Sequence, residues 1–134
     1  MNTSAMDLVT LMPFTGKCGI RIVAASATEV RGELAWSSDL CTAGGVMHGG
    51  ALMTLADSVG ATCAFLNLPP GASTTTIESK SNFFRALRTG RAVATATPLH
   101  VGRTIIVVQT DIRDEQEKRI ALVTQTQAVL AGGT

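Results

Sequence analysis

Asp57 is the only formally charged side chain between Asp39 and Glu78, within a segment that is otherwise small, apolar or neutral. A carboxylate in such surroundings is costly unless it is paired, hydrogen-bonded or turned toward a wet cleft. An unpaired carboxylate in such surroundings is also typical of a catalytic nucleophile or general base. Two hypotheses are therefore open: a catalytic carboxylate, or a structural one that Thr54, Ser58 or a backbone amide satisfies.

Two glycines, Gly49 and Gly50, precede Asp57 at the start of a predicted helix over residues 48–66. They let a ligand approach the first free N–H groups of the helix, where the dipole favours negative charge. Such an amide suits a carbonyl oxygen that becomes an oxyanion. Asp57 lies eight residues after Gly49, which is roughly 12 Å along a helix axis. We therefore expect a site shared between two helices in a dimer.

The helix over residues 48–66 is predicted from its apolar positions, which recur at steps of three and four. These positions are Leu52, Leu55, Ala56, Val59 and Cys63. Charge is scarce on every side of the segment, so we expect most of its circumference to be buried. Two prolines and a glycine within 68–71 end it.

The other elements are predicted strands. They comprise a hairpin of 20–27 and 30–36, then 73–84, 91–99, 104–113 and 119–130, the last two joined by a charged turn. Residues 1–16 are weakly specified, with a short helix or loop that Pro13 ends. Strands joined by short turns make an antiparallel sheet, and one apolar helix must cover its face. The sequence thus predicts one α+β domain over 1–134; because both sheet faces are apolar, it also predicts an oligomer.

Composition narrows the classes of partner and compartment. The chain has 134 residues and a formal net charge of +1, which removes the electrostatic reason to expect nucleic acid or an anionic membrane as partner. It has no continuous apolar run long enough for a membrane span and no basic leader typical of a secretory signal. Three cysteines without a C-x-x-C pair favour buried, reduced thiols and a cytoplasmic location.

Two blocks of this sequence resemble the hotdog-fold acyl-CoA thioesterases, in particular the phenylacetate-pathway (PaaI-like) branch. The first block is His48-Gly49-Gly50 followed by Leu55-Ala56-Asp57, and the second is Thr76-Ile77-Glu78-Ser79-Lys80-Ser81-Asn82-Phe83-Phe84-Arg85, which resembles a T-x-E-x-x-x-N-F-x-R strand. The resemblance runs from Gly16 to Leu130. It implies a long central helix wrapped by a curved antiparallel sheet of five to six strands, dimers with a continuous sheet, and usually homotetramers.

The resemblance also implies hydrolysis of an acyl-CoA thioester without a metal or redox cofactor, coenzyme A entering as part of the substrate. The Gly49 amide, next to Gly50, would polarise the thioester carbonyl. Asp57 of the facing subunit would attack directly or activate water, and the Thr76 hydroxyl would help place that water or the carboxylate. Many relatives carry Asn six residues before the histidine, where this chain has Thr42. A hydroxyl lacks the paired donor and acceptor of an amide, so we expect weaker activity or a shifted substrate.

Arginines at strand ends are candidates for the coenzyme A phosphates, because guanidinium forks bind phosphate well. We expect two of Arg85, Arg88, Arg91 and Arg103 to do so, and the turn 100–103 is where relatives often touch the nucleotide. The alternative is that they are solvated charges that protect sheet edges. His48 is expected to position the loop or substrate, or to cap the helix, rather than to act as a general base.

Two rival functions remain. A non-catalytic acyl-thioester binding or scaffold protein stays open because of Thr42. A dehydratase acting on a 3-hydroxyacyl thioester is disfavoured because its acid should face the histidine, whereas Asp57 follows His48 within one helix. Among other residues, Glu78 is expected on the same sheet face as Thr76, two positions away. Trp36 and Phe83 are expected in the core.

Overall fold

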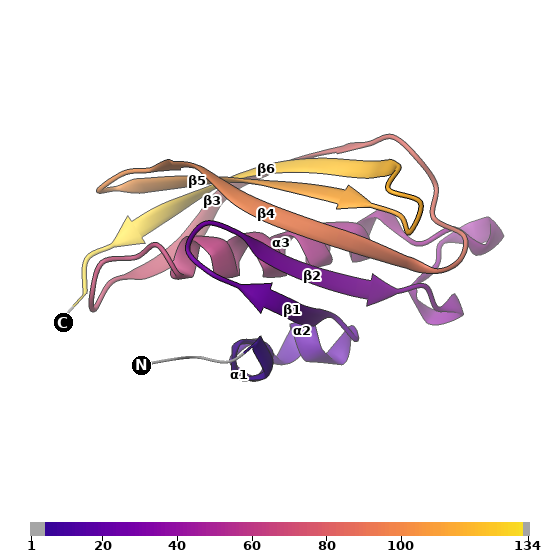
Figure 1. The fold of residues 1–134 in the computed structure, drawn as a ribbon, viewed down its shortest axis with the longest axis horizontal. Helices are drawn as coiled ribbons and strands as arrows, with labels where there is room; N and C mark the ends of the chain where they lie inside the picture. The colour runs from indigo at the N-terminus through magenta and orange to yellow at the C-terminus, as the bar shows by residue number, and fades with distance from the viewer. Residues whose placement is uncertain (1–4, 133–134) are drawn as a thin grey trace.

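A computed structural model describes residues 5–132, in which one long helix lies along one face of a curved sheet (Figure 1). The helices are α1 (Ala5–Thr10), α2 (Pro13–Lys17) and α3 (Gly49–Phe65). The strands are β1 (Arg21–Ala25), β2 (Val30–Ala35), β3 (Ser73–Phe83), β4 (Arg91–Val101), β5 (Ile105–Arg113) and β6 (Arg119–Leu130). All pairings are antiparallel, in the order β1-β2-β4-β5-β6-β3. The predicted α+β fold, a long helix wrapped by a curved antiparallel sheet, is confirmed.

The core lies between α3 and the sheet. Leu55 and Val59 on the helix are fully buried, as are the inward alanines of β4 and the inward aliphatic residues of β5. Small residues let the helix approach closely. A Cβ on Gly32 would lie 2.6 Å from the Val59 Cγ2 atom, so this position in β2 has no room for a larger residue.

Two expectations about single residues were wrong. Pro13 does not end the first helix. It begins α2 instead, a position where its missing N–H costs nothing. Phe83 is 48% exposed rather than buried. The expected burial of most of the α3 circumference is confirmed, and the exposed residues of this helix, Met53, Asp57 and Phe65, form one stripe. None of the helices in residues 5–132 is long and apolar enough to cross a membrane.

A β-bulge in β3 overturns the expected placement of Glu78. Thr76 pairs with Gln127 and Glu78 with Thr126, and the register shifts between them. Neighbouring residues of β6 point to opposite faces of the sheet. Thr76 therefore faces α3 while Glu78 faces outward, because the extra residue Ile77 reverses the alternation.

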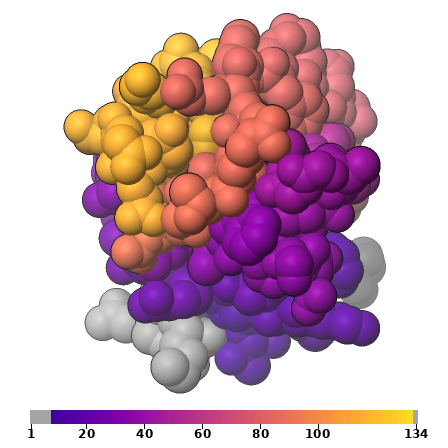
Figure 2. All heavy atoms as spheres, turned by 90° about the vertical axis from the view of Figure 1, so that its right-hand side faces the viewer, coloured from indigo at the N-terminus to yellow at the C-terminus, as the bar shows by residue number. Residues whose placement is uncertain are grey.

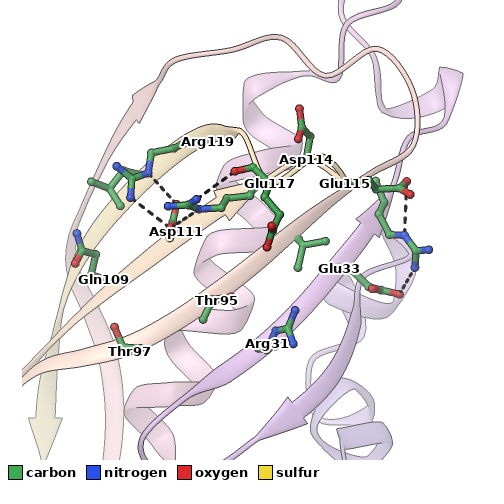
Figure 3. Close-up of a pocket in the computed structure, with 14 residues that line it drawn as sticks. Arg31, Glu33, Thr95, Thr97, Gln109, Asp111, Asp114, Glu115, Glu117 and Arg119 are labelled. Carbon is green, nitrogen blue, oxygen red and sulfur yellow. Dashed lines mark hydrogen bonds and ion pairs between the residues drawn. The ribbon is translucent and has the colours of Figure 1, made fainter.

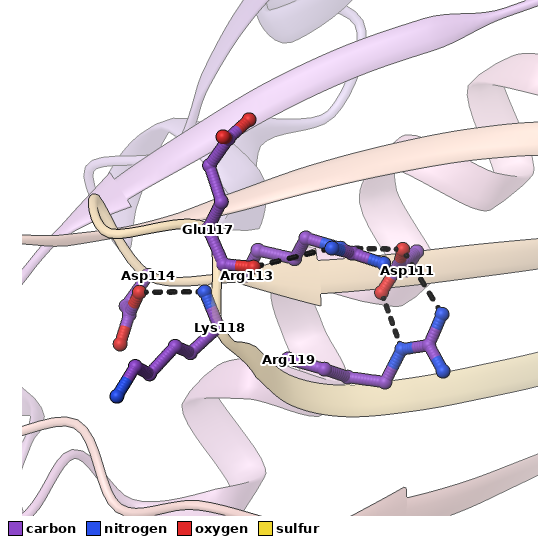
Figure 4. A network of polar contacts seen from close by, with 6 residues as sticks. All are labelled: Asp111, Arg113, Asp114, Glu117, Lys118 and Arg119. Atoms are coloured by element: carbon purple, nitrogen blue, oxygen red, sulfur yellow. Dashed lines mark hydrogen bonds and ion pairs between the residues drawn. The ribbon is translucent and has the colours of Figure 1, made fainter.

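The outer face of the sheet, away from α3, carries a charged hollow of about 610 Å³ lined from β2, β4, β5, β6 and the β5–β6 turn (Figure 3). At its centre, Asp111 receives hydrogen bonds from Arg113 Nε (2.8 Å) and Arg119 Nε (2.9 Å) (Figure 4). Burial opposes ionisation of Asp111, but the hydrogen bonds from Arg119 and Arg113 outweigh it and lower the pKa of the carboxyl. The folded state therefore favours the charged form.

The Asp111 network predicts a pH-dependent contribution to stability. Because the folded pKa lies below the unfolded value, the contribution is present above that unfolded value and is lost as pH falls through the folded one. Replacing Asp111 by Asn should lower the melting temperature by ~2 °C at pH 7, since exposed ion pairs are weak. The gap between variant and wild type should close on acidification in thermal scans. A gap unchanged down to pH 2 would contradict this assignment.

Candidate active site

The loop that leads into α3 is held by two side chains on its carbonyl oxygens. Gly44 and Gly45 have φ angles of 79° and 73°, a left-handed conformation that glycine adopts without strain. Trp36 Nε1 donates to the Gly45 oxygen at 3.0 Å and Arg88 donates to the Gly44 oxygen at 3.2 Å. Thr42 lies exposed in this loop, and its backbone N–H donates to Val46. The loop therefore presents the start of α3 in a defined position.

The first turn of α3 leaves one amide free. Gly50 N–H donates to His48 Nδ1 at 2.7 Å, while Ala51 N–H and Leu52 N–H both donate to the His48 carbonyl oxygen. No group among residues 5–132 accepts from Gly49 N–H. Of the two candidate glycine amides, only that of Gly49 is available to a ligand, at the positive end of the helix dipole.

The same hydrogen bonds define the role of His48. Its Nδ1 atom accepts the Gly50 amide, which makes it the N-cap of α3. A nitrogen engaged in this way cannot also take a proton from a substrate or water. The structure therefore places His48 as the capping residue, one of the roles expected from the sequence.

Phe83 forms a wall beside the free amide. A Cβ on Gly49 would lie 3.3 Å from the Phe83 Cζ atom, so the ring packs directly over the glycine. Phe83 was not assigned to the site from the sequence, because a phenylalanine in a predicted strand is typical of a core residue. Its proximity to Gly49 follows from the pairing of β3 with β6.

Asp57 opens into a groove on the exposed stripe of α3. The groove has a volume of about 550 Å³ and is lined from α3, α2 and β3 by Met53, Gly50, Thr54, Asp57, Ser58, Thr15, Met12, Phe14 and Ser79. Asp57 has no cationic partner in the described part of the chain. Among residues 5–132, the one hydrogen bond to its carboxylate comes from Gln125 Nε2 at 3.3 Å.

The side chains that were expected to hydrogen-bond a structural Asp57 are engaged elsewhere. The Thr54 hydroxyl donates to the Gly50 oxygen at 2.8 Å, and the Ser58 hydroxyl lies 2.7 Å from that of Thr15. Neither satisfies the carboxylate. Asp57 is thus an exposed, singly bonded carboxylate at the edge of an apolar groove, and it retains lone pairs for a substrate or a water molecule.

Two buried glutamines on β6 were missed. Gln125 and Gln127 are each 1% exposed and point toward α3, where Gln125 contacts Asp57 and Gln127 donates to the Thr76 hydroxyl at 2.8 Å. A signal was present in the sequence, because both fall on the inward positions that Ala121 and Val123 begin. Two amides in the apolar register of a strand require partners.

The groove contains Ser79 rather than Thr76. Ser79 pairs with Gln125 in the β3–β6 ladder, whereas Thr76 pairs with Gln127. The Thr76 hydroxyl faces the helix but accepts from Gln127 and does not line the groove. Within one chain, Ser79 and not Thr76 therefore lines the groove that contains Asp57.

The candidate arginines divide between the two ends of the molecule. Arg88 lies near the start of α3; Arg85 precedes it in the same connection and lies 3.8 Å from Asp114. Figure 2 looks onto this end, where the 84–90 connection and the β5–β6 turn gather. Arg103 follows β4 at its far end, roughly 35 Å away at the rise of a strand. One chain cannot bring all three to one nucleotide.

Capping by His48 predicts a measurable loss of stability on its removal. His48→Ala should reduce the free energy of unfolding by ~1 kcal/mol, because Gly50 N–H loses its acceptor. His48→Asn supplies a carbonyl oxygen at the same place and should recover most of that loss. Urea unfolding of the three proteins measures the difference. Equal stability of the alanine and wild-type proteins would show that the cap contributes nothing.

Comparison with known proteins places the chain in a family. A family model described as the thioesterase superfamily matches residues 44–121, which include Gly49, Asp57 and Thr76 but end before Gln125. The chain is 33% identical over 86 residues to the 1,4-dihydroxy-2-naphthoyl-CoA hydrolase of Escherichia coli, covering 64% of this chain and 63% of that protein. The match spans 62% of a curated relative from Haemophilus influenzae and 57% of one from Vibrio cholerae.

Solved structures agree over nearly the whole chain. A thioesterase from Haemophilus influenzae superposes with a TM-score of 0.92 at 28% identity, covering 98% of this chain and 93% of that one. A mutant thioesterase from Pseudomonas aeruginosa gives 0.90 at 26% identity, covering 97% and 96%. The likeness confirms the hotdog fold, while the phenylacetate branch stays a prediction. The chain belongs to the thioesterase superfamily.

Proposed function

We propose that the protein hydrolyses an acyl-CoA thioester to the free acid and coenzyme A. The observation that carries this proposal is the unpaired Gly49 amide at the start of α3, on the same helix as the exposed carboxylate of Asp57. An amide at a helix N-terminus stabilises a carbonyl oxygen as it gains negative charge. A carboxylate supplies either the attacking oxygen or a base for water. Membership of the thioesterase superfamily supports the same reaction.

Either route for Asp57 gives the same products. In direct attack, a carboxylate oxygen adds to the thioester carbon, the thiolate of coenzyme A leaves, and water then hydrolyses the mixed anhydride. In base catalysis, Asp57 takes a proton from water, the resulting hydroxide adds to the carbon, and the proton passes to the departing sulfur. Gly49 N–H donates to the carbonyl oxygen in both. Neither route needs a metal or redox cofactor, so none is proposed.

The active site is proposed to form between two copies of the chain. Gly49 and Asp57 are eight residues apart on one unbroken helix, roughly 12 Å along its axis, which is too far for one acyl carbon. The strand β3 is an edge of the sheet, and most of its eleven residues are exposed. A long unpaired edge of this kind is a template for another strand.

Antiparallel pairing of two β3 strands about a two-fold axis extends the sheet and orients the two α3 helices in opposite directions. The Gly49 end of one chain then lies on the same side as the Arg103 end of the other. Arg103 can therefore join Arg85 and Arg88 at one nucleotide, which a single chain does not allow. The exposed Ile77, Phe83 and Phe84 of the β3 region become covered. This dimer is the minimum assembly that we propose.

We extend the proposal to a homotetramer in the cytoplasm. The hollow on the outer sheet face carries arginines and carboxylates together, so two such faces can pair opposite charges across a second axis. All three cysteines are free, which suits a reducing compartment. Burial raises the pKa of the Cys63 thiol to about 11, so this cysteine stays protonated.

The first test is thiol release from a panel of acyl-CoA esters with short, long, aryl and hydroxylated aryl groups. Wild type should hydrolyse at least one ester, and Asp57→Asn should lose at least about a hundredfold in kcat, because an amide is neither a nucleophile nor a base here. The preferred ester identifies the acyl class. Binding of acyl-CoA without thiol release by either protein would instead support the scaffold function that Thr42 keeps open.

A second test asks whether the site is shared. Gly49→Pro removes the amide proton where proline is tolerated, since it is the first residue of α3 and His48 already has extended angles of −61° and 135°. Gly49→Ala places the same Cβ against Phe83 but keeps the proton, so it should lose less activity than Gly49→Pro. Heterodimers of Asp57→Asn with Gly49→Pro chains contain one intact composite site, so they should recover about half the wild-type kcat.

An inactive mixed dimer would contradict the shared site. If each site lay within one chain, every site of the mixed dimer would carry one defect, and it would stay as inactive as both parents. Two different affinity tags on co-expressed chains isolate the mixed dimer. Light scattering on the same sample measures its mass and tests the proposed dimer directly.

A further inference from the structure

We infer that Gln125 is a positioning residue for the Asp57 carboxylate, held in place by the absence of a side chain at Gly60. The inference rests on the proposed function of Asp57 and deepens it. Gln125 lies on β6, outside the residues that the family model matches. It reaches the site from a strand 68 positions along the chain from Asp57.

The contact crosses the interface between α3 and the sheet. Gln125 is 1% exposed, whereas Asp57 is exposed at the groove. The amide nitrogen donates to Asp57 Oδ1 at 3.3 Å. This bond restrains Oδ1, and no described residue donates to the other carboxylate oxygen of Asp57, which lines the groove. Since Thr54 and Ser58 are engaged elsewhere, Gln125 is the described residue that restrains the Asp57 side chain.

Gly60 provides the space that the Gln125 amide occupies. A Cβ on Gly60 would lie 2.7 Å from Gln125 Cδ and would overlap its Oε1 atom. Gly60 is one helical turn after Asp57 and is buried. A residue larger than glycine would displace the amide from its present position. The reach of Gln125 to Asp57 therefore depends on the identity of residue 60.

The orientation of the amide follows from the charge of its neighbour. Turning it over would aim Oε1 at a carboxylate oxygen, two acceptors without a proton between them. With Nε2 toward Asp57, Oε1 is buried and has no hydrogen-bond partner among residues 5–132. The nearby Thr110 hydroxyl is also without one. A buried, half-satisfied amide opposes folding, so its benefit is expected in the positioning of Asp57 rather than in stability.

Because Gln125 is expected to favour catalysis but not stability, replacing it should distinguish a positioning role from a structural one. Gln125→Met keeps the length of the side chain and removes both polar atoms, so the protein should be as stable as wild type or more so. A carboxylate free to rotate spends less time in the reactive geometry, which should lower kcat about tenfold. The KM should stay within about twofold, because Gln125 is buried and does not line the groove.

The experiment compares Gln125→Met, Gly60→Ala and both changes together, each measured for kcat, KM and melting temperature with the ester that wild type prefers. Gly60→Ala keeps both polar side chains but displaces the amide, so its kcat should fall to the level of Gln125→Met. The double variant should fall no further, because both changes remove the same contact. Thr62→Val is the matched control. It removes a buried helix hydroxyl that bonds Ser58 and should leave kcat unchanged.

The outcomes distinguish this inference from the proposed function. If Asp57→Asn keeps wild-type activity, the catalytic role of Asp57 fails and the inference fails with it. If Asp57→Asn is inactive but Gln125→Met and Gly60→Ala match wild type in kcat, the inference alone is overturned. A fall in kcat that appears in Thr62→Val as well, and that follows the loss in melting temperature across all the variants, would also overturn it. Gln125→Met in the Asp57→Asn background should not change the residual rate.

Discussion

The close packing of α3 against the sheet is the constraint on which the rest of this structure depends. The same helix supplies the centre of the core, through residues such as Leu55 and Val59, and both candidate catalytic groups. Glycines at 32 and 60 remove the side chains that would hold the two layers apart. Because the buried face is committed to the core, the orientation of Asp57 toward the exposed side is determined by the packing and not by the carboxylate itself.

The packing of α3 also limits what one chain can do chemically. One straight helix holds the Gly49 amide and the Asp57 carboxylate at a separation that no side-chain rotation closes. In the dimer that we propose, each chain carries two half-sites, and the exposed edge strand β3 joins them. Assembly and catalysis are coupled in the proposed enzyme, since the surface that makes the dimer also completes the site. Phe83, which lies beside Gly49 and is half-exposed in the single chain, would be covered in that proposed dimer.

Most of the elements could be predicted because their signals are local. The helix predicted over 48–66 is observed at Gly49–Phe65, and the last strand has the predicted ends. The errors arose where a neighbour across space decides the outcome. The bulge at Ile77 exists only in the pairing of β3 with β6, and it separates Glu78 from Thr76. Whether Phe83 is buried or exposed likewise depends on what packs against it, and the periodicity of the sequence does not report that.

The sequence by itself determined the element types, the isolation of Asp57 among uncharged residues and the glycines that begin α3, because each depends on residues within a few positions. Only the tertiary structure decided which groups touch them. It showed that His48 takes the Gly50 amide and leaves that of Gly49 free. It also brought Gln125 to Asp57. Hydrogen-bond partners so distant in sequence are chosen by strand register and by the space between layers, which exist only once the chain has folded.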